Sequence, residues 1–172
     1  LRAGKAVFVE KPLAIDEAGL ADVVEAQLAS GQLLCVGFNR RFSPLVEKAR
    51  GAFAPGTCLA IDYRINAGHV PKDSWVHDPG DGGGRIIGEV CHFVDLVQYL
   101  CKDVPVEVFA HALGAPDGAQ HDTINATIRF AHGSIAVISY YATGDSAVAK
   151  ERIEIFGGGR VALLDDFRER SE

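Results

Sequence analysis

The sequence of 172 residues contains no methionine and a single tryptophan, Trp75. Because a translated protein starts with methionine, we expect further sequence ahead of Leu1 in the intact protein. No apolar run approaches the roughly 18 residues of a membrane-spanning helix, and the first residues lack the organisation of a signal peptide. These absences predict a soluble, cytoplasmic protein with no membrane partner.

Cysteine and positive charge are also limited. The four cysteines, at positions 35, 58, 91 and 101, form no C-x-x-C pair, and three of them lie in apolar runs. This pattern predicts reduced, buried thiols and no metal site. Lys and Arg number 17 against 23 Asp and Glu, for a net charge of −6. Nucleic-acid-binding surfaces need clustered Lys and Arg, so we expect no nucleic-acid partner.

A glycine-rich nucleotide-binding loop of the form G-x-G-x-x-G is missing ahead of the first strands. The three consecutive glycines at 157–159 lie between two strand-like segments, with no helix after them to bind a pyrophosphate. We interpret these glycines as a hairpin turn.

The first 37 residues have the pattern strand, helix, strand. Apolar runs at 6–10 and 33–38 flank an amphipathic segment at 16–30, with Asp16 suited to the N-cap and Gly31 to the C-cap. Two apolar strands joined by a helix form a parallel βαβ unit. Such strands are normally buried on both faces by more layers than this chain supplies.

From residue 57 onward the pattern favours strands. The helix predicted at 88–101 carries Val90, Phe93 and Val97 on one face, suited to packing on a sheet. We predict an α+β fold with α/β character at the N-terminus: a βαβ unit followed by an open, mainly antiparallel sheet with helices on one face. The expected strands cover residues 57–67, 104–113, 121–130, 134–142, 151–156 and 160–164.

The first candidate catalytic residue is Lys11. The strand at 6–10 ends in Glu10-Lys11-Pro12, at the edge of a sheet where open α/β folds bind ligands. The alternative is an exposed lysine in a strand-to-helix turn.

The second candidate is His92 in the predicted helix. His92 shares a face with Asp95, and Glu89 lies one turn away on the flank. Histidine titrates near neutral pH and can accept a hydroxyl proton while hydride leaves the same carbon. The alternative is a solvated polar helix face.

Three motifs occur in a fixed order: EKP at 10–12, GFNRRF at 37–42 and GGGRIIGEVCHFVDL at 82–96. With these motifs the sequence resembles the glucose–fructose oxidoreductase / inositol dehydrogenase / MocA family of NAD(P)-dependent sugar and polyol dehydrogenases, from the first residue to about residue 156. The resemblance implies that residues 1–37 are the end of a dinucleotide-binding Rossmann domain. Residues 38–172 are then a substrate-binding and oligomerisation domain.

The family resemblance also implies roles for individual residues. Glu10, Lys11 and Pro12 match the family's cofactor-contacting motif, in which the lysine lies between the nicotinamide of NAD or NADP and the substrate hydroxyl. His92 matches the base of the family motif GG-x-x-x-D-x-x-x-H. The aspartate of that motif is replaced by Gly88 here. Either the neighbouring Glu89 substitutes for it, or His92 works with Lys11 alone, or the reaction differs.

Further candidates for substrate binding are Asn39, Arg40, Trp75 and Asp95. Arginine forks suit carboxylates, and the face of Trp75 could stack on a sugar ring. The alternatives are arginines paired with acids at a helix entry and a tryptophan that anchors its loop.

Two functions remain open at this stage. The favoured one is the catalytic half of a dehydrogenase that acts on a secondary hydroxyl of a sugar, cyclitol or polyol. The other is a non-catalytic β-sheet module for oligomerisation or partner binding. In both cases, apolar residues on the second sheet face, such as Ile135 and Val137, predict a homo-oligomer through that face.

Overall fold

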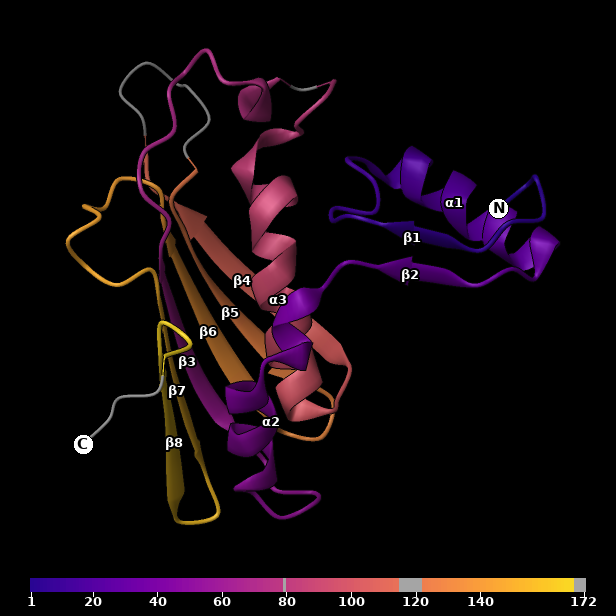
Figure 1. Ribbon diagram of the computed structural model, residues 1–172. Helices are drawn as coiled ribbons and strands as arrows, with labels where there is room; N and C mark the ends of the chain where they lie inside the picture. Colours follow the sequence, from indigo (N-terminus) through magenta and orange to yellow (C-terminus); the bar gives the residue numbers. More distant parts are fainter. Residues whose placement is uncertain (79, 115–121, 169–172) are drawn as a thin grey trace. The chain divides into compact units, whose positions relative to one another are not determined.

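The computed structural model describes residues 1–78, 80–114 and 122–168 (Figure 1). The chain divides into two compact units: Leu1–Asn39 with Pro71–His92, and Arg40–Val70 with Phe93–Glu172. Position 121, where the sequence predicts the start of a strand, lies outside the described residues. The domain division expected after residue 37 remains a prediction, because a compact unit need not coincide with a domain of the intact protein.

The first unit contains the expected βαβ motif. Strands β1 (Val7–Val9) and β2 (Leu34–Val36) pair in parallel and are connected by helix α1 (Glu17–Ser30). The Asp16 side chain accepts a hydrogen bond of 2.7 Å from the Gly19 backbone N–H, and Gly31 ends the helix with a left-handed φ of 61°. Both caps predicted from the sequence are therefore confirmed.

The apolar surface of this unit is only partly covered. Phe8, Leu28 and Leu33 are exposed, and Ala26 is the buried residue of α1. Cys35 on β2 is exposed as well, so the prediction of buried thiols was wrong. Cys58 is also exposed, and Cys91 and Cys101 are partly exposed. A two-stranded sheet with one helix is too thin to bury both of its faces.

The second segment of the first unit leads toward the helix predicted at 88–101. It contains a short 3₁₀ helix, η2 (Trp75–His77), and a single π-helical turn, η3 (Ile86–Val90). Helix α3 (Cys91–Cys101) follows η3 directly. The sequence predicted a helix here but not its π turn, which is a feature frequent at functional sites.

The second unit is an open sheet with helices on one face (Figure 1). Among the described residues it has six strands in the order β4-β5-β6-β3-β7-β8. The β3–β6 pair is parallel and the other pairs are antiparallel, as expected for a mainly antiparallel sheet. The strands are β3 (Ala60–Asn66), β4 (Pro105–Ala112), β5 (Ile124–Phe130), β6 (Ile135–Tyr141), β7 (Glu151–Gly157) and β8 (Arg160–Asp165).

Helices α2 (Pro44–Gly51) and α3 lie on the same face of this sheet (Figure 1). The sequence analysis did not predict α2, whose eight residues are too few for a clear apolar period. Phe93 of α3 is buried against two strands, with its ring centroid 5.2 Å from Tyr63 and 5.9 Å from Tyr140. These aromatic contacts centre the core between α3 and the sheet.

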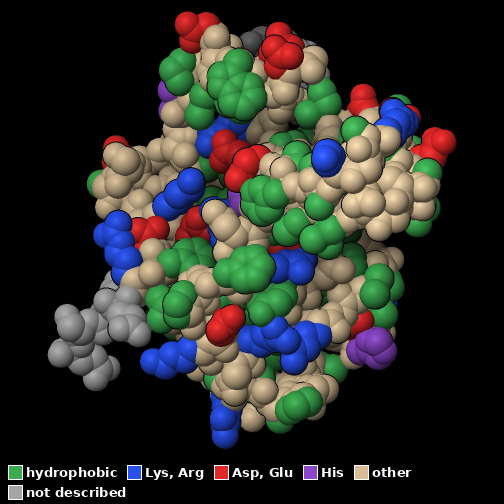
Figure 2. Space-filling view, turned by 45° about the vertical axis from the view of Figure 1, so that its right-hand side comes forward, with side chains coloured by type: hydrophobic (Ala, Val, Ile, Leu, Met, Phe, Trp, Pro, Cys, Tyr) green, Lys and Arg blue, Asp and Glu red, His purple; other side chains and the backbone are tan. Residues whose placement is uncertain are grey.

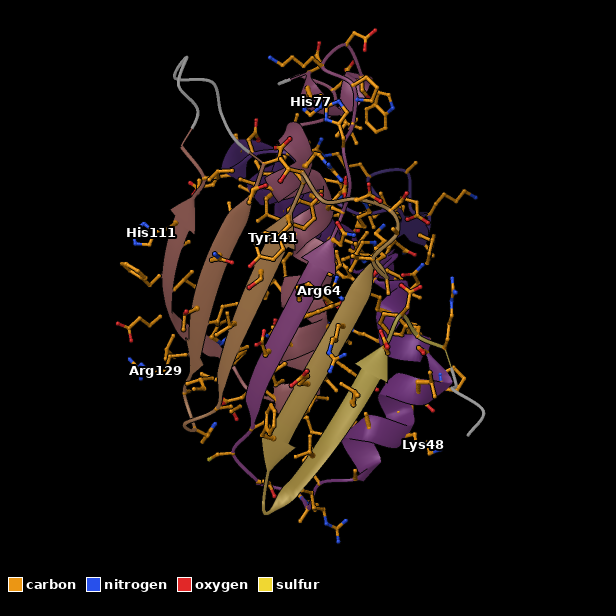
Figure 3. The ribbon with its side chains drawn as sticks, turned by 90° about the vertical axis from the view of Figure 1, so that its left-hand side faces the viewer. Lys48, Arg64, His77, His111, Arg129 and Tyr141 are labelled. Atoms are coloured by element: carbon orange, nitrogen blue, oxygen red, sulfur yellow. The ribbon has the colours of Figure 1, made fainter. Side chains whose placement is uncertain are left out.

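The other face of the sheet is open. Burial alternates strictly along β5, as a sheet with one covered face requires. Figure 3 views this open face, on which Arg64 of β3, His111 of β4, Arg129 of β5 and Tyr141 of β6 are labelled. Polar residues share the face with exposed apolar side chains: Phe109, Ile135, Phe156, Val161 and Leu163.

An ion pair between the part-buried Arg40 and the buried Glu151 ties the start of the second unit to the sheet. Arg40 lies in the 3₁₀ helix η1 (Asn39–Phe42) and donates two hydrogen bonds to the Glu151 carboxylate of β7, at 2.9 and 2.6 Å. The Tyr63 hydroxyl donates to the same carboxylate. Burial raises the pKa of Tyr63 well above its usual range, and the negative charge of Glu151 raises it further. The Tyr63 proton therefore stays in place.

Removal of the Glu151 charge tests this ion pair. We expect Glu151→Gln to lower the free energy of unfolding by about 3–5 kcal/mol, because it leaves the Arg40 guanidinium uncompensated. The exposed pair Arg129–Glu107 is the matched control, and Glu107→Gln should cost only about 0–1 kcal/mol. Urea denaturation followed by circular dichroism measures both. Equal losses in the two variants would contradict the assignment of a stabilising pair.

Candidate active site

The first unit brings Lys11 to the helix that carries His92. Lys11 lies two residues after the end of β1 and is half-buried. Its ammonium Nζ donates a hydrogen bond of 2.7 Å to the carbonyl oxygen of Gly88, in the π turn η3. Gly88 precedes His92 by four residues. The end of β1 and the start of α3, which are distant in sequence, therefore meet at one place.

Glycines make this approach possible. A Cβ atom at Gly82 would lie 2.3 Å from the carbonyl oxygen of Val76, and one at Gly83 would lie 3.1 Å from the Ile15 side chain. Gly83 also has a φ of +67°. Side chains at these two positions are therefore excluded. The glycine run brings the backbone before η3 against η2 and against the segment that follows Lys11.

His92 is held in a largely enclosed position. It is 9% exposed. Its ring meets the ring of Phe38, just after β2, edge to face at 5.9 Å between centroids. The alternative of a solvated polar face is therefore wrong for His92. A buried imidazole next to apolar carbon is shielded from bulk water, which suits a group that exchanges a proton with a bound ligand.

Glu89 is directed to an arginine. The Arg85 guanidinium is buried, and its Nε lies 2.9 Å from the Glu89 Oε1 atom, one helical turn away. A second contact joins Arg85 Nη2 to Glu89 Oε2 at 3.4 Å. This pair neutralises the carboxylate that the sequence suggested as a substitute for the missing aspartate. Its arginine partner was missed, although the i, i+4 spacing of Arg85 and Glu89 is a recognisable signal.

The neighbours of Lys11 in the Glu-Lys-Pro motif have different surroundings. Glu10 is exposed, and a Cβ atom at Gly37 would lie only 3.0 Å from its Oε2 atom, so this carboxylate lies against the end of β2. Pro12 is half-buried, and the Lys11–Pro12 peptide bond is cis. These residues stand at the carboxyl ends of two parallel strands, the usual ligand-binding edge of an open α/β sheet.

Two predicted substrate-binding residues of this unit are exposed. Trp75 in η2 is 68% exposed, and a Cβ atom at Gly82 would lie 2.5 Å from its carbonyl oxygen. The loop that Trp75 belongs to therefore abuts the glycine run, while its indole is free to meet a ligand. Asn39 is exposed after β2.

The other two candidates, Arg40 and Asp95, belong to the second unit and are engaged in ion pairs. Arg40 binds Glu151, as described above. Asp95 is buried, and its two carboxylate oxygens accept hydrogen bonds from Nε and Nη2 of the Arg41 guanidinium. These hydrogen bonds raise the pKa of Arg41, although burial opposes them. The structure thus matches the alternative of arginines paired with acids, and Arg41, whose guanidinium suits a carboxylate as that of Arg40 does, is the partner of Asp95.

The arrangement in the first unit offers a proton donor and a proton acceptor. An ammonium has three hydrogen-bond donors and an imidazole can accept a proton. Within the described ranges there is no group of three or more His, Cys, Asp or Glu residues that could hold a metal ion. Nor do those ranges hold a helix long and apolar enough to cross a membrane. On the face shown in Figure 2, Lys and Arg side chains are interspersed with Asp and Glu.

Known proteins resemble this chain over most of its length. The inositol 2-dehydrogenase of Rhizobium meliloti strain 1021 is 29% identical over 94% of this chain and 50% of its own sequence. The myo-inositol 2-dehydrogenase of Thermotoga maritima is 28% identical over 98% of this chain and 52% of its own sequence. The chain therefore spans about half the length of these curated relatives.

Solved structures agree with the sequence comparison. A probable dehydrogenase from Thermotoga maritima superimposes with a TM-score of 0.77 at 28% identity, covering 95% of this chain and 50% of its own. The myo-inositol dehydrogenase of Lactobacillus casei in complex with NAD(H) and myo-inositol shares the fold, with a TM-score of 0.74 at 19% identity over 93% of this chain and 48% of its own. The GFO/IDH/MocA C-terminal domain pattern matches residues 53–159, more than half of the sequence, and the chain therefore belongs to the GFO/IDH/MocA family.

Proposed function

We propose that this chain is the catalytic and substrate-binding half of a nicotinamide-dependent dehydrogenase that acts on a secondary hydroxyl of a sugar, cyclitol or related polyol. The observation that carries the proposal is the hydrogen bond from Lys11 to the Gly88 carbonyl, four residues before the buried His92. A module that served only for oligomerisation would need neither group. The inositol dehydrogenases among the relatives support the same reaction class.

In this proposal His92 is the general base. It removes the hydroxyl proton as the carbon is oxidised, and Phe38 fixes the orientation of its ring. Lys11 binds the oxygen of the same hydroxyl with an ammonium proton that is not used on Gly88. Glu89 acts indirectly, because its carboxylate is bound to Arg85 at the turn before His92.

The residues present fit one end of a nicotinamide cofactor. Glu10, Lys11 and Pro12 stand at the carboxyl end of β1, where such a ring would be held, whereas the sequence has no G-x-G-x-x-G loop for a pyrophosphate. When bound, NAD or NADP would accept the hydride that leaves the substrate C–H bond, while the hydroxyl proton goes to His92 and a ketone results. Lys11 would then contact both cofactor and substrate.

Substitution of His92 tests the general base. In the intact enzyme, His92→Ala should lower kcat by roughly 10²–10⁴-fold, the usual contribution of a positioned base, while cofactor affinity stays near its original value. The exposed His132 of the second unit is the matched control, and His132→Ala should leave kcat nearly unchanged. Steady-state kinetics and cofactor titration measure both. Near-normal turnover in His92→Ala would eliminate this base.

The chain alone should bind NADH poorly and oxidise no substrate, because it contains no pyrophosphate-binding loop. Isothermal titration calorimetry of the 172-residue chain, with the intact protein measured in parallel, tests this expectation. Micromolar affinity of the isolated chain for NADH would refute it.

We also propose that the open sheet face forms a homo-oligomer. Its exposed apolar side chains on β4, β6, β7 and β8 exceed what a monomer ordinarily leaves in water. An aspartate in the middle of such an interface would be buried without a partner.

Light scattering at high micromolar concentration tests the assembly. The original protein should have the mass of an oligomer, and Ile135→Asp, on the open face, should shift the mass toward the monomer. Lys48→Glu is the matched control, because Lys48 lies on α2, on the covered side of the sheet (Figure 3). A monomeric mass for the original protein would contradict the proposal.

A further inference from the structure

Lys11 carries a positive charge that the described residues leave without a carboxylate counter-ion. Its half-buried ammonium has three donors, and the structure gives it one acceptor, the neutral carbonyl of Gly88. Within the described residues, Lys11 forms no ion pair with a carboxylate. A partly desolvated ammonium is stabilised most by a nearby negative charge. The Lys11 ammonium would therefore be stabilised further by a bound group with a negative charge.

The acidic side chains nearest in sequence and along the helix are placed elsewhere. Glu89 is neutralised by the buried Arg85. Glu10 lies with its carboxylate against the end of β2, at Gly37. Neither of these two carboxylates forms an ion pair with Lys11.

Gly88 leaves room at the turn that accepts the Lys11 hydrogen bond. A Cβ atom built there would meet a single neighbour, the Gly82 carbonyl oxygen, at 3.4 Å. Small side chains are therefore tolerated at this position. Because Gly88 has no side chain, there is space for ligand atoms beside the helix.

We propose, building on the dehydrogenase function above, that the substrate supplies the missing negative charge: it is a polyhydroxylated carboxylic acid, a sugar acid or a cyclitol acid. Its carboxylate binds one Lys11 proton and the reacting hydroxyl binds another. The carboxylate itself is unchanged in the reaction, since the bonds that break are the C–H and O–H bonds of the secondary alcohol.

The geometry of an ammonium limits where the carboxylate lies in the substrate. Two oxygens at about 2.8 Å from one tetrahedral nitrogen are at most roughly 4.6 Å apart. The carboxylate therefore lies close to the reacting hydroxyl in the bound substrate. An α- or β-hydroxy acid meets this condition without folding back on itself.

Matched acid and neutral compounds test the inference in the intact enzyme with NAD⁺ and NADP⁺. The pairs are D-gluconate with D-glucitol, D-glucuronate with D-glucose, and D-galactonate with galactitol. At least one acid should exceed its neutral match by about tenfold or more in kcat/KM, the effect of one hydrogen bond between charged groups. Calorimetry with the enzyme saturated with NADH or NADPH, which cannot accept hydride from the alcohol, should give the same order of affinities without turnover.

Two variants at Gly88 separate charge from space. Gly88→Asp should reduce the affinity for the preferred acid by about tenfold or more, because the new carboxylate takes the place of the ligand's charge beside Lys11. Gly88→Ala fills similar space without charge and should keep the preference for the acid. If both variants lost the preference for the acid over its neutral match equally, the loss would come from the filled space and not from the charge, and the inference would be overturned.

The outcomes for the two proposals can be told apart. If no acid binds more tightly than its neutral match, the inference of an acidic substrate is overturned. Nicotinamide-dependent oxidation of a neutral polyol in that case leaves the dehydrogenase function in place. Absence of nicotinamide-dependent turnover with all six compounds counts against the dehydrogenase function itself, while the affinities still decide the preference for acids.

Discussion

The hydrogen bond from the Lys11 ammonium to the Gly88 carbonyl joins two segments that are 77 residues apart in the chain. Its geometry depends on the glycines at 82 and 83, since side chains there would collide with the η2 backbone and with Ile15. It also depends on β1, which ends at Val9, two residues before Lys11. The end of β1, the glycines at 82 and 83 and the turn before α3 thus meet at one place. The position of the Lys11 ammonium in the site depends on all three.

Much of this fold could be predicted, because its signals are local. The caps at Asp16 and Gly31 follow from side-chain chemistry, and the alternation along β5 follows from a sheet covered on one face. Lys11 and His92 were recognised as candidates from motif order, and the structure brings both into one unit. The π turn and the carbonyl acceptor at Gly88 have no sequence signal, because any residue presents the same backbone oxygen.

Adjacent arginines at 40 and 41 illustrate what a motif leaves undetermined. Sequence chemistry marks both as carboxylate binders, and the structure supplies the carboxylates from within the protein, Glu151 and Asp95. Burial lowers the pKa of Arg40, and the hydrogen bonds and charge of Glu151 more than restore it. Arg40 is therefore a permanent cation paired with its own counter-ion, and it fixes the start of the second unit to the sheet.

The π turn at Ile86–Val90 has a consequence for how this site can diversify. A π turn holds one residue more than an α-helical turn, so a one-residue deletion there can be absorbed as regular helix. The core side chains of α3, such as Phe93 and Val97, would keep their places. The residues ahead of His92 would rotate by about 100°. A one-residue deletion in the π turn can thus move an acidic side chain toward Lys11 or away from it. The sheet and its packing would stay unchanged.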